Sequence, residues 1–78
     1  MTNKEKYINS FIEAFNINKD AAVIAKYQVT QSWDSIGHMT LISLLEDAFD
    51  IMMDTDDIID FSSFKKGMEI MQKYDVEI

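Results

Sequence analysis

Residues 33–50 read WDSIGHMTLISLLEDAFD, and this stretch decides the fold. Asp34 is a favourable helix N-cap, and the apolar residues that follow it recur at helical spacing. Met39 and Leu44 are expected to stay partly exposed. The stripe expected to face the core consists of Leu41, Ile42, Leu45 and Phe49. The helix is too apolar for a one-sided surface helix, so it is either central or meets a partner.

Patterns on both sides of this stretch predict three more helices. The first has Thr2 or Asn3 as its N-cap, and its apolar stripe consists of Ile8, Phe11, Ile12 and Phe15. A single short helix is expected around Ile58 and Ile59, with Asp54, Asp56 and Asp57 at its positive end, where acids are favourable. The last helix has Ser62 or Ser63 as its N-cap, and its stripe consists of Phe64, Met68 and Met71. The sequence therefore predicts an all-α fold, a small four-helix bundle of three longer helices and one short helix.

Residues 17–34 show weaker periodicity and are predicted to form a long loop. Residues 21–25 fit a short turn of helix, and residues 29–33 are expected to be extended. A loop of this length in a small domain is usually functional or packs against the core. The apolar side chains expected to pack are Val23, Ile24, Tyr27, Val29 and Trp33.

The chain has 78 residues, so residues 1–78 are expected to form one domain. Because 47% of the residues are hydrophobic and none is cysteine, packing alone has to stabilise the fold. No apolar run approaches the roughly 20 residues that span a bilayer, and the polar start lacks the apolar core of a signal peptide. We therefore expect a cytoplasmic monomer that does not insert into membranes.

The net charge of −7 is concentrated in the middle of the chain. Residues 1–33 carry a charge of +1 and residues 61–78 carry none, whereas residues 34–60 contain eight acids and no lysine or arginine. The acids are Asp34, Glu46, Asp47, Asp50, Asp54, Asp56, Asp57 and Asp60. Such a segment repels nucleic acid and anionic membranes and attracts a basic protein partner. The alternative is a solvated face that only keeps the protein dissolved.

His38 is the only histidine and follows Ser35 by three residues, so both side chains can face the same way on one helix. This spacing permits a serine–histidine dyad. Gly37 and Gly67 are the only glycines, so a glycine-rich oxyanion loop is absent, and a histidine that faces solvent or lies at the edge of the core is the favoured interpretation. Residues 54–57 can attract a divalent cation but lack the glycine and the distant glutamate of an EF-hand loop. We expect neither an enzyme nor a specific metal site.

Ser35 stands at the start of the most apolar helix, after a capping aspartate and at the end of the long loop. A phosphodiester attached there would lie beside free backbone N–H groups and the positive end of the helix dipole. Taken alone, the tripeptide Asp34-Ser35-Ile36 fits an ordinary helix start equally well.

The wider segment resembles the phosphopantetheine attachment region of acyl carrier proteins. That family has an Asp-Ser-Leu-like motif at the start of its second helix, here residues 34–36, and an aliphatic and acidic pattern ending in Glu-x-x-Phe, here residues 46–49. The likeness continues through Met52-Met53, the acidic residues 54–57 and Ser62-Ser63-Phe64. It covers roughly residues 32–74, while the first third matches only in length and helix placement.

The resemblance implies a stand-alone carrier that performs no catalysis of its own. In the family, a phosphopantetheinyl transferase uses magnesium to move 4′-phosphopantetheine from coenzyme A to the motif serine, here Ser35. The thiol of this arm holds an acyl or aminoacyl group as a thioester, which a loading ligase supplies and an acyltransferase or synthase receives. The surface that meets these partners is implied to contain Asp34, Ile36, Met39, Glu46, Asp47, Asp56 and Asp57.

The start of this helix departs from the carriers of fatty acid synthesis in its charge. Those carriers commonly have acids two and six residues after the motif serine, where this chain has Gly37 and Leu41, and Thr40 is also uncharged. In this respect the chain is more similar to carriers of specialised or cell-surface polysaccharide pathways; peptidyl and D-alanyl carriers share the fold. The alternative from another class is an acidic helical adaptor that docks a basic partner without a covalent arm. A small serine hydrolase ranks far behind.

Overall fold

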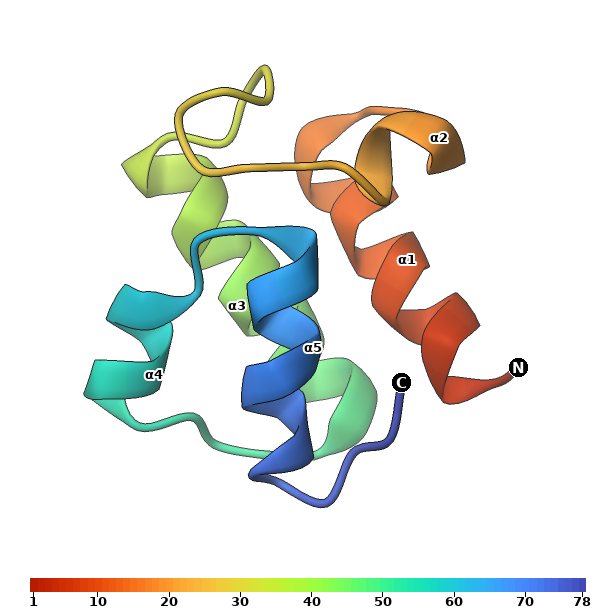
Figure 1. Ribbon diagram of the computed structural model, residues 1–78, viewed down its shortest axis with the longest axis vertical. Helices are drawn as coiled ribbons and strands as arrows, with labels where there is room; N and C mark the ends of the chain where they lie inside the picture. Colours follow the sequence, from red (N-terminus) through yellow and green to blue (C-terminus); the bar gives the residue numbers. More distant parts are fainter.

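Five helices and no strand make up the fold in the computed structural model, which describes residues 1–78 (Figure 1). The helices are α1 (Asn3–Phe15), α2 (Lys19–Ala22), α3 (Ser35–Phe49), α4 (Thr55–Asp60) and α5 (Phe64–Gln72). The all-α prediction is confirmed, as are the three longer helices and the short helix with acids at its start. The predicted number of four helices is one too low, because four residues of the first loop also form a helix.

Side-chain caps fix where the helices begin. Thr2, one of the two candidates, caps α1: its hydroxyl accepts a hydrogen bond from the Glu5 N–H, and the Glu5 carboxylate accepts one from the Thr2 N–H, both at 3.1 Å. Asn18 caps α2 by accepting from the Ala21 N–H at 2.8 Å. This helix therefore begins two residues before the predicted turn. Ser63, the second of its two candidates, caps α5.

The core lies between α1, α3 and α5, and the loop before α3 closes one end of it (Figure 1). Its buried aromatic side chains are Tyr7, Phe11, Phe15, Trp33, Phe61 and Phe64. The Phe11 ring contacts those of Trp33 and Phe64 at centroid distances of 5.5 and 5.1 Å, and Trp33 stacks on Phe15 at 5.0 Å. Because each such pair adds about 0.5–1.5 kcal/mol beyond the burial of area, the cluster anchors the loop to α1 through Trp33.

α3 is a core helix along most of its length and faces solvent at its start. Leu41, Ile42 and Leu45 are buried, as predicted, and Phe49 is half-buried. Met39, in the second turn, is 56% exposed. None of the five helices is both long enough and apolar enough to cross a membrane.

The loop between α2 and α3 is wound into turns, and the prediction that residues 29–33 are extended is wrong. Gln28 and Ser32 have positive φ angles of 64° and 70°. The Gln28 N–H donates to the Trp33 carbonyl at 2.9 Å, and the Trp33 N–H donates to the Thr30 carbonyl at 3.1 Å. These bonds satisfy the backbone locally, so the chain folds back on itself before α3.

Backbone hydrogen bonds also fasten this loop to the junction between α4 and α5. The Tyr27 N–H donates to the Ser62 carbonyl, and the Phe64 N–H donates to the Ala25 carbonyl, both at 2.9 Å. With the backbone held in this way, Trp33 turns fully into the core and Tyr27 is half-buried. The prediction that all the apolar side chains of the loop pack is wrong for Val23, Ile24 and Val29, which are exposed.

Candidate functional site

Ser35 is the first residue of α3, and its side chain is exposed. The helix begins here because the Asp34 carboxylate accepts a hydrogen bond from the Gly37 N–H at 2.9 Å. The His38 N–H donates to the Asp34 carbonyl at 2.8 Å as the first helical bond. The N–H groups of Ser35 and Ile36 therefore have no backbone partner and form the positive end of α3, whose first turn contains no acid.

Gly37 is required by a close contact between the loop and the first turn of α3. A Cβ atom at this position would lie 1.9 Å from the Ser32 carbonyl oxygen and 3.2 Å from the Phe15 ring. Only glycine permits so close an approach of two backbone segments. Gly37, where fatty-acid-synthesis carriers commonly have an acid, is therefore required by packing. Its lack of a side chain lets the loop lie directly against the turn that contains Ser35.

Two surface hollows border Ser35. The first, of about 360 Å³, lies between α3 and α4 and is lined in part by Met39, Ile58 and Ile59. The second, of about 550 Å³, runs along the outer face of α3 beside Ile36 and Met39. Ile36 and Ile59 are 80% and 71% exposed. A flexible group attached to the Ser35 hydroxyl would therefore have apolar surface within reach on both sides.

Most of the predicted docking residues are accessible. Those that are exposed are Asp34, Ile36, Met39, Asp47 and Asp56. Glu46 is half-buried because its carboxylate accepts a hydrogen bond from the Met53 N–H at 3.0 Å, which ties the end of α3 to the segment before α4. Asp47 follows Ser35 by twelve residues, or about 18 Å along the helix. The structure therefore brings the apolar docking residues close to Ser35 and leaves the acids of α3 at the far end.

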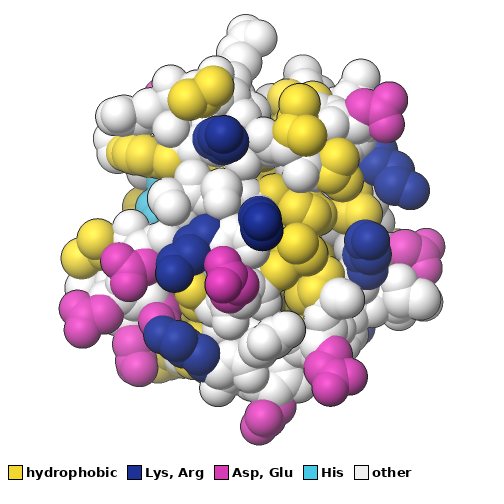
Figure 2. Space-filling model, viewed as in Figure 1, with side chains coloured by type: hydrophobic (Ala, Val, Ile, Leu, Met, Phe, Trp, Pro, Cys, Tyr) yellow, Lys and Arg dark blue, Asp and Glu magenta, His cyan; other side chains and the backbone are white.

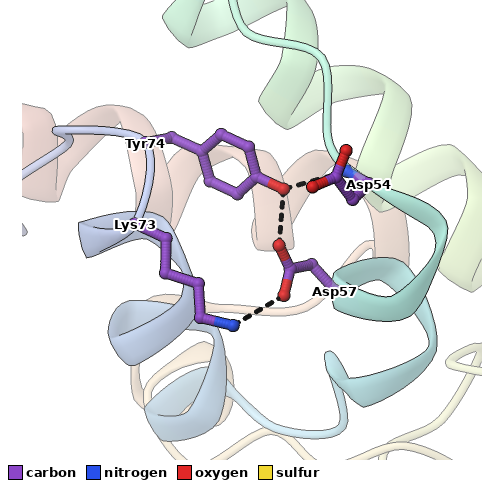
Figure 3. A network of polar contacts seen from close by, with 4 residues as sticks. All are labelled: Asp54, Asp57, Lys73 and Tyr74. Atoms are coloured by element: carbon purple, nitrogen blue, oxygen red, sulfur yellow. Dashed lines mark hydrogen bonds and ion pairs between the residues drawn. The ribbon is translucent and has the colours of Figure 1, made fainter.

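Asp57 is buried, contrary to the prediction that it meets a partner. α4 turns its carboxylate towards the end of α5, where it accepts hydrogen bonds from the Lys73 ammonium at 2.9 Å and the Tyr74 hydroxyl at 2.5 Å (Figure 3). Both hydrogen bonds lower the pKa of the Asp57 carboxyl, and the bond from Tyr74 has the larger effect. Asp57 therefore joins α4 to the end of α5. Because its carboxylate is buried and already bonded, it is not available to a partner.

Lys73 and Tyr74 are polar partners of α4 that the local sequence pattern does not predict. The Tyr74 hydroxyl also accepts a hydrogen bond from the Asp54 N–H at 2.9 Å, so one side chain contacts both the cap and the first turn of α4 (Figure 3). Burial is the main reason why the pKa of Tyr74 is raised, and the hydrogen bond to Asp57 raises it further. The hydrogen bond to Asp57 also raises the pKa of Lys73. The only signal in the sequence was the position of Tyr74 one turn beyond the apolar stripe of α5.

Of the eight acids in the middle segment, Asp57 is buried and Glu46 is half-buried, so six are exposed. Figure 2 shows acidic side chains gathered over α4, with lysines beside them. Lys73 and Asp57 form the one side-chain ion pair. A basic partner would therefore meet separate exposed acids and not all eight together.

His38 is not paired with Ser35. The Trp33 indole Nε1–H donates to His38 Nδ1 at 3.0 Å, and His38 Nε2 lies 2.7 Å from the Ile58 carbonyl oxygen. Both ring nitrogens are engaged, so neither is free to accept the serine proton. The interpretation of His38 as a histidine at the edge of the core is confirmed.

No family model, curated protein or solved structure matches this chain. No group of three or more histidine, aspartate or glutamate side chains converges as metal ligands would. At Ser35 the chain provides an exposed hydroxyl at the positive end of a helix, with apolar surface on both sides. This arrangement suits the covalent attachment of a group that is linked through a phosphate.

Proposed function

We propose that this chain is an acyl carrier protein that bears 4′-phosphopantetheine on Ser35. The observation that carries the proposal is the exposed Ser35 hydroxyl, which directly follows the Asp34 cap of α3 and lies between two apolar hollows. The resemblance of residues 32–74 to acyl carrier proteins supports the same assignment. On this proposal the chain presents cargo to enzymes and does no catalysis itself.

The residues around Ser35 fit the phosphate end of such an arm. The free N–H groups of Ser35 and Ile36 favour a negative charge beside them. The carboxylate of Asp34 is engaged by the Gly37 N–H, which reduces its repulsion of that charge. When bound, the arm supplies the thiol that holds an acyl or aminoacyl group, in a chain that has no cysteine of its own.

The proposed docking surface runs from the start of α3 along its exposed side and onto α4. Its partners are a phosphopantetheinyl transferase, a loading ligase and an acyltransferase or synthase, each with a basic surface that complements the exposed acids. We add Ile59 to the proposed apolar contacts, because its side chain is exposed and lines the hollow between α3 and α4. The surface then contains Asp34, Ile36, Met39, Asp47, Asp56 and Ile59, with Glu46 at its margin. Because no acid lies between Asp34 and Glu46, we propose a specialised or polysaccharide-related pathway.

Intact mass after incubation with coenzyme A and a broad-specificity transferase tests the proposal. The wild-type chain should gain the mass of one phosphopantetheine. Ser35→Ala should gain none while remaining helical by circular dichroism. Ser43→Ala is the matched control, because Ser43 is exposed two turns further along the same helix, and it should be modified like the wild type. Full modification of the Ser35→Ala chain would contradict the assignment.

The acidic adaptor remains the second candidate because exposed acids accompany the exposed Ile36, Met39 and Ile59. Such a surface can dock a basic partner with no covalent arm. A folded wild-type chain that never accepts phosphopantetheine would favour the adaptor over the carrier.

A further inference from the structure

The His38 ring joins three segments of the chain through its two nitrogens. Nδ1 accepts a hydrogen bond from the Trp33 indole Nε1–H at 3.0 Å, and Nε2 lies 2.7 Å from the carbonyl oxygen of Ile58 in α4. Because a carbonyl only accepts hydrogen bonds, Nε2 is the donor in the second pair. One side chain of α3 therefore holds both the loop before α3 and the helix α4. We call these two hydrogen bonds the His38 bridge.

Aromatic rings fix the orientation of this imidazole. It stacks on the Trp33 ring at a centroid distance of 6.1 Å and an angle of 16°. The rings of Tyr27 and Phe61 meet it edge-on, at 5.5 and 6.3 Å. The stacked ring and the two edge contacts hold His38 so that Nε2 points towards α4.

The short helix α4 is bonded to the rest of the chain at both of its ends. At its start it is bonded to the side chains of Tyr74 and Lys73 (Figure 3). In its second half, the Ile58 carbonyl is bonded to His38. A helix of six residues makes few hydrogen bonds of its own, so its position depends on such outside bonds and on packing.

The bond to His38 fixes the backbone directly before Ile59. The Ile58 carbonyl belongs to the peptide group that links the two isoleucines, and this group is planar. The Ile59 side chain is 71% exposed and lines the hollow between α3 and α4 together with Ser35 and His38. The His38 bridge therefore determines where an exposed apolar side chain of α4 lies relative to the Ser35 hydroxyl.

We propose that His38 is a positioning residue for the enzyme that modifies Ser35, and that it acts by holding Ile59 where this enzyme binds. The inference rests on the proposed function. It gives His38 no contact with coenzyme A and no part in the group transfer. Without the His38 bridge, the second half of α4 is free to move, and the enzyme meets Ile59 in more than one position. Binding of the chain is then weaker, while transfer within the bound complex keeps its rate, so KM rises and kcat does not fall.

Two substitutions separate the hydrogen bonds of His38 from its bulk. In His38→Gln the amide oxygen accepts from the indole and the amide nitrogen donates to the Ile58 carbonyl, whereas His38→Leu makes neither bond. With coenzyme A and a broad-specificity transferase, His38→Leu should raise the KM for the chain about tenfold, with kcat within about twofold of the wild type. His38→Gln should restore the wild-type KM. An unchanged KM in His38→Leu, or a His38→Gln chain that is equally impaired, would overturn the proposal.

A double-mutant cycle tests whether His38 acts through Ile59. Ile59→Ala alone should raise KM, and it should raise KM little further in the His38→Leu chain. Independent, additive effects of the two substitutions would contradict the proposal. Tyr7→Phe is the control for lower stability alone, because it removes the buried hydrogen bond from the Tyr7 hydroxyl to the Phe64 carbonyl between α1 and α5. Its KM should equal that of the wild type.

Residual dipolar couplings of the unmodified chain measure the orientation of α4 relative to α3 without any transferase. The couplings of the α4 amides should depart from the wild-type values in His38→Leu and match them in His38→Gln. Unchanged couplings in His38→Leu overturn the inference, whatever the transferase does. A folded wild-type chain that takes no arm contradicts the proposed function, whatever the couplings show.

One further measurement needs no variant and holds even if His38→Leu does not fold. The imidazole ¹⁵N shifts of the wild type at pH 8 should show the tautomer with hydrogen on Nε2. The tautomer with hydrogen on Nδ1 would overturn the His38 bridge, because it cannot accept the indole N–H of Trp33.

Discussion

Single residues at the start of α3 depend on the loop that lies against them. Gly37 has no room for a Cβ atom beside the Ser32 carbonyl, and Ser32 itself has a φ angle of 70°. Trp33 is buried and bonded to His38. The position of Ser35 therefore rests on contacts made by its neighbours on both sides and not on the Asp34 cap alone.

Replacing Gly37 by alanine tests this contact. Alanine is favoured over glycine inside a helix by about 1 kcal/mol, yet overpacking usually costs about 1–3 kcal/mol. We therefore expect Gly37→Ala to lower the free energy of unfolding, measured by urea denaturation. Thr40→Ala, at an exposed position of the same helix, should stay within about 0.5 kcal/mol of the wild type. A Gly37→Ala protein as stable as the wild type would show that the loop moves aside at little cost.

The lowered pKa of Asp57 gives the stability a defined pH dependence. In the unfolded chain the pKa of this carboxyl is about 4, which is above its folded-state pKa. The unfolded chain therefore binds the proton first as the pH falls. The contribution of Asp57 is complete above the unfolded-state pKa and is lost as the pH falls through the folded-state pKa. We expect Asp57→Asn to lower the melting temperature at pH 7, and its difference from the wild type to shrink as the pH falls below about 4.

The exposed Asp47→Asn is the control for this measurement, and its difference from the wild type should change much less over the same pH range. If the difference for Asp57→Asn stays constant from pH 7 to pH 2, the bonds from Tyr74 and Lys73 do not stabilise the ionised carboxylate.

At the scale of the elements, the short helix α4 and the long helix α3 place acids at opposite ends of their dipoles. Asp56 lies in the first turn of α4, where a negative charge is favourable. Asp50 follows the last turn of α3, which contains no base, and has a φ angle of 53°. Its charge is therefore unfavourable, while asparagine adopts the same backbone conformation readily.

The same charge change at these two positions should therefore have opposite effects. At low salt, Asp50→Asn should raise the free energy of unfolding by about 0.3–1 kcal/mol, and Asp56→Asn should lower it by a similar amount. Both differences should shrink at high salt, because screening weakens exposed charges. Denaturant titration at two salt concentrations measures them. A shift in the same direction for both variants would show that net charge matters and position does not.

The elements that could be predicted from sequence are those whose pattern is local. The stripe of α3 and the caps Thr2 and Asp34 follow from spacing along a few turns. The loop before α3 could not be predicted, because the bond from Tyr27 to Ser62 that fastens it joins residues far apart in the chain. Ser35 could be proposed as a site because its motif is local. The partners of Asp57 could not be predicted, because they come from the end of α5, far away in the chain.

At the scale of the whole molecule, the hollows beside Ser35 are lined in part by apolar side chains, and the acids within α3 lie at the far end of that helix. Of the three uncharged positions that distinguish the chain from fatty-acid-synthesis carriers, Leu41 is fully buried and belongs to the core. Thr40 is exposed, and its hydroxyl donates to the Ile36 carbonyl at 3.1 Å. Thr40 is thus the position at which a charge is most readily added.

On the proposed carrier function, we expect the loaded chain to be a poor substrate for fatty-acid-synthesis enzymes, with turnover about tenfold or more below that of a dedicated carrier. Thr40→Glu should raise this turnover about 1.4- to 5-fold, since an exposed charge pair contributes about 0.2–1 kcal/mol. Thr40→Gln is the control, because it adds a side chain of similar size without the charge. Wild-type turnover equal to that of the dedicated carrier would contradict the pathway proposal and leave the carrier assignment intact.

The attachment of phosphopantetheine to Ser35 is tested most directly by locating the modified residue. The wild-type chain is incubated with coenzyme A and a transferase, digested, and its peptides are fragmented in a mass spectrometer. The chain has six serines, of which Ser32 and Ser43 flank Ser35. We predict that the added mass lies on Ser35 and on no other residue. Modification of any other serine, or none in a chain that is folded, would contradict the account.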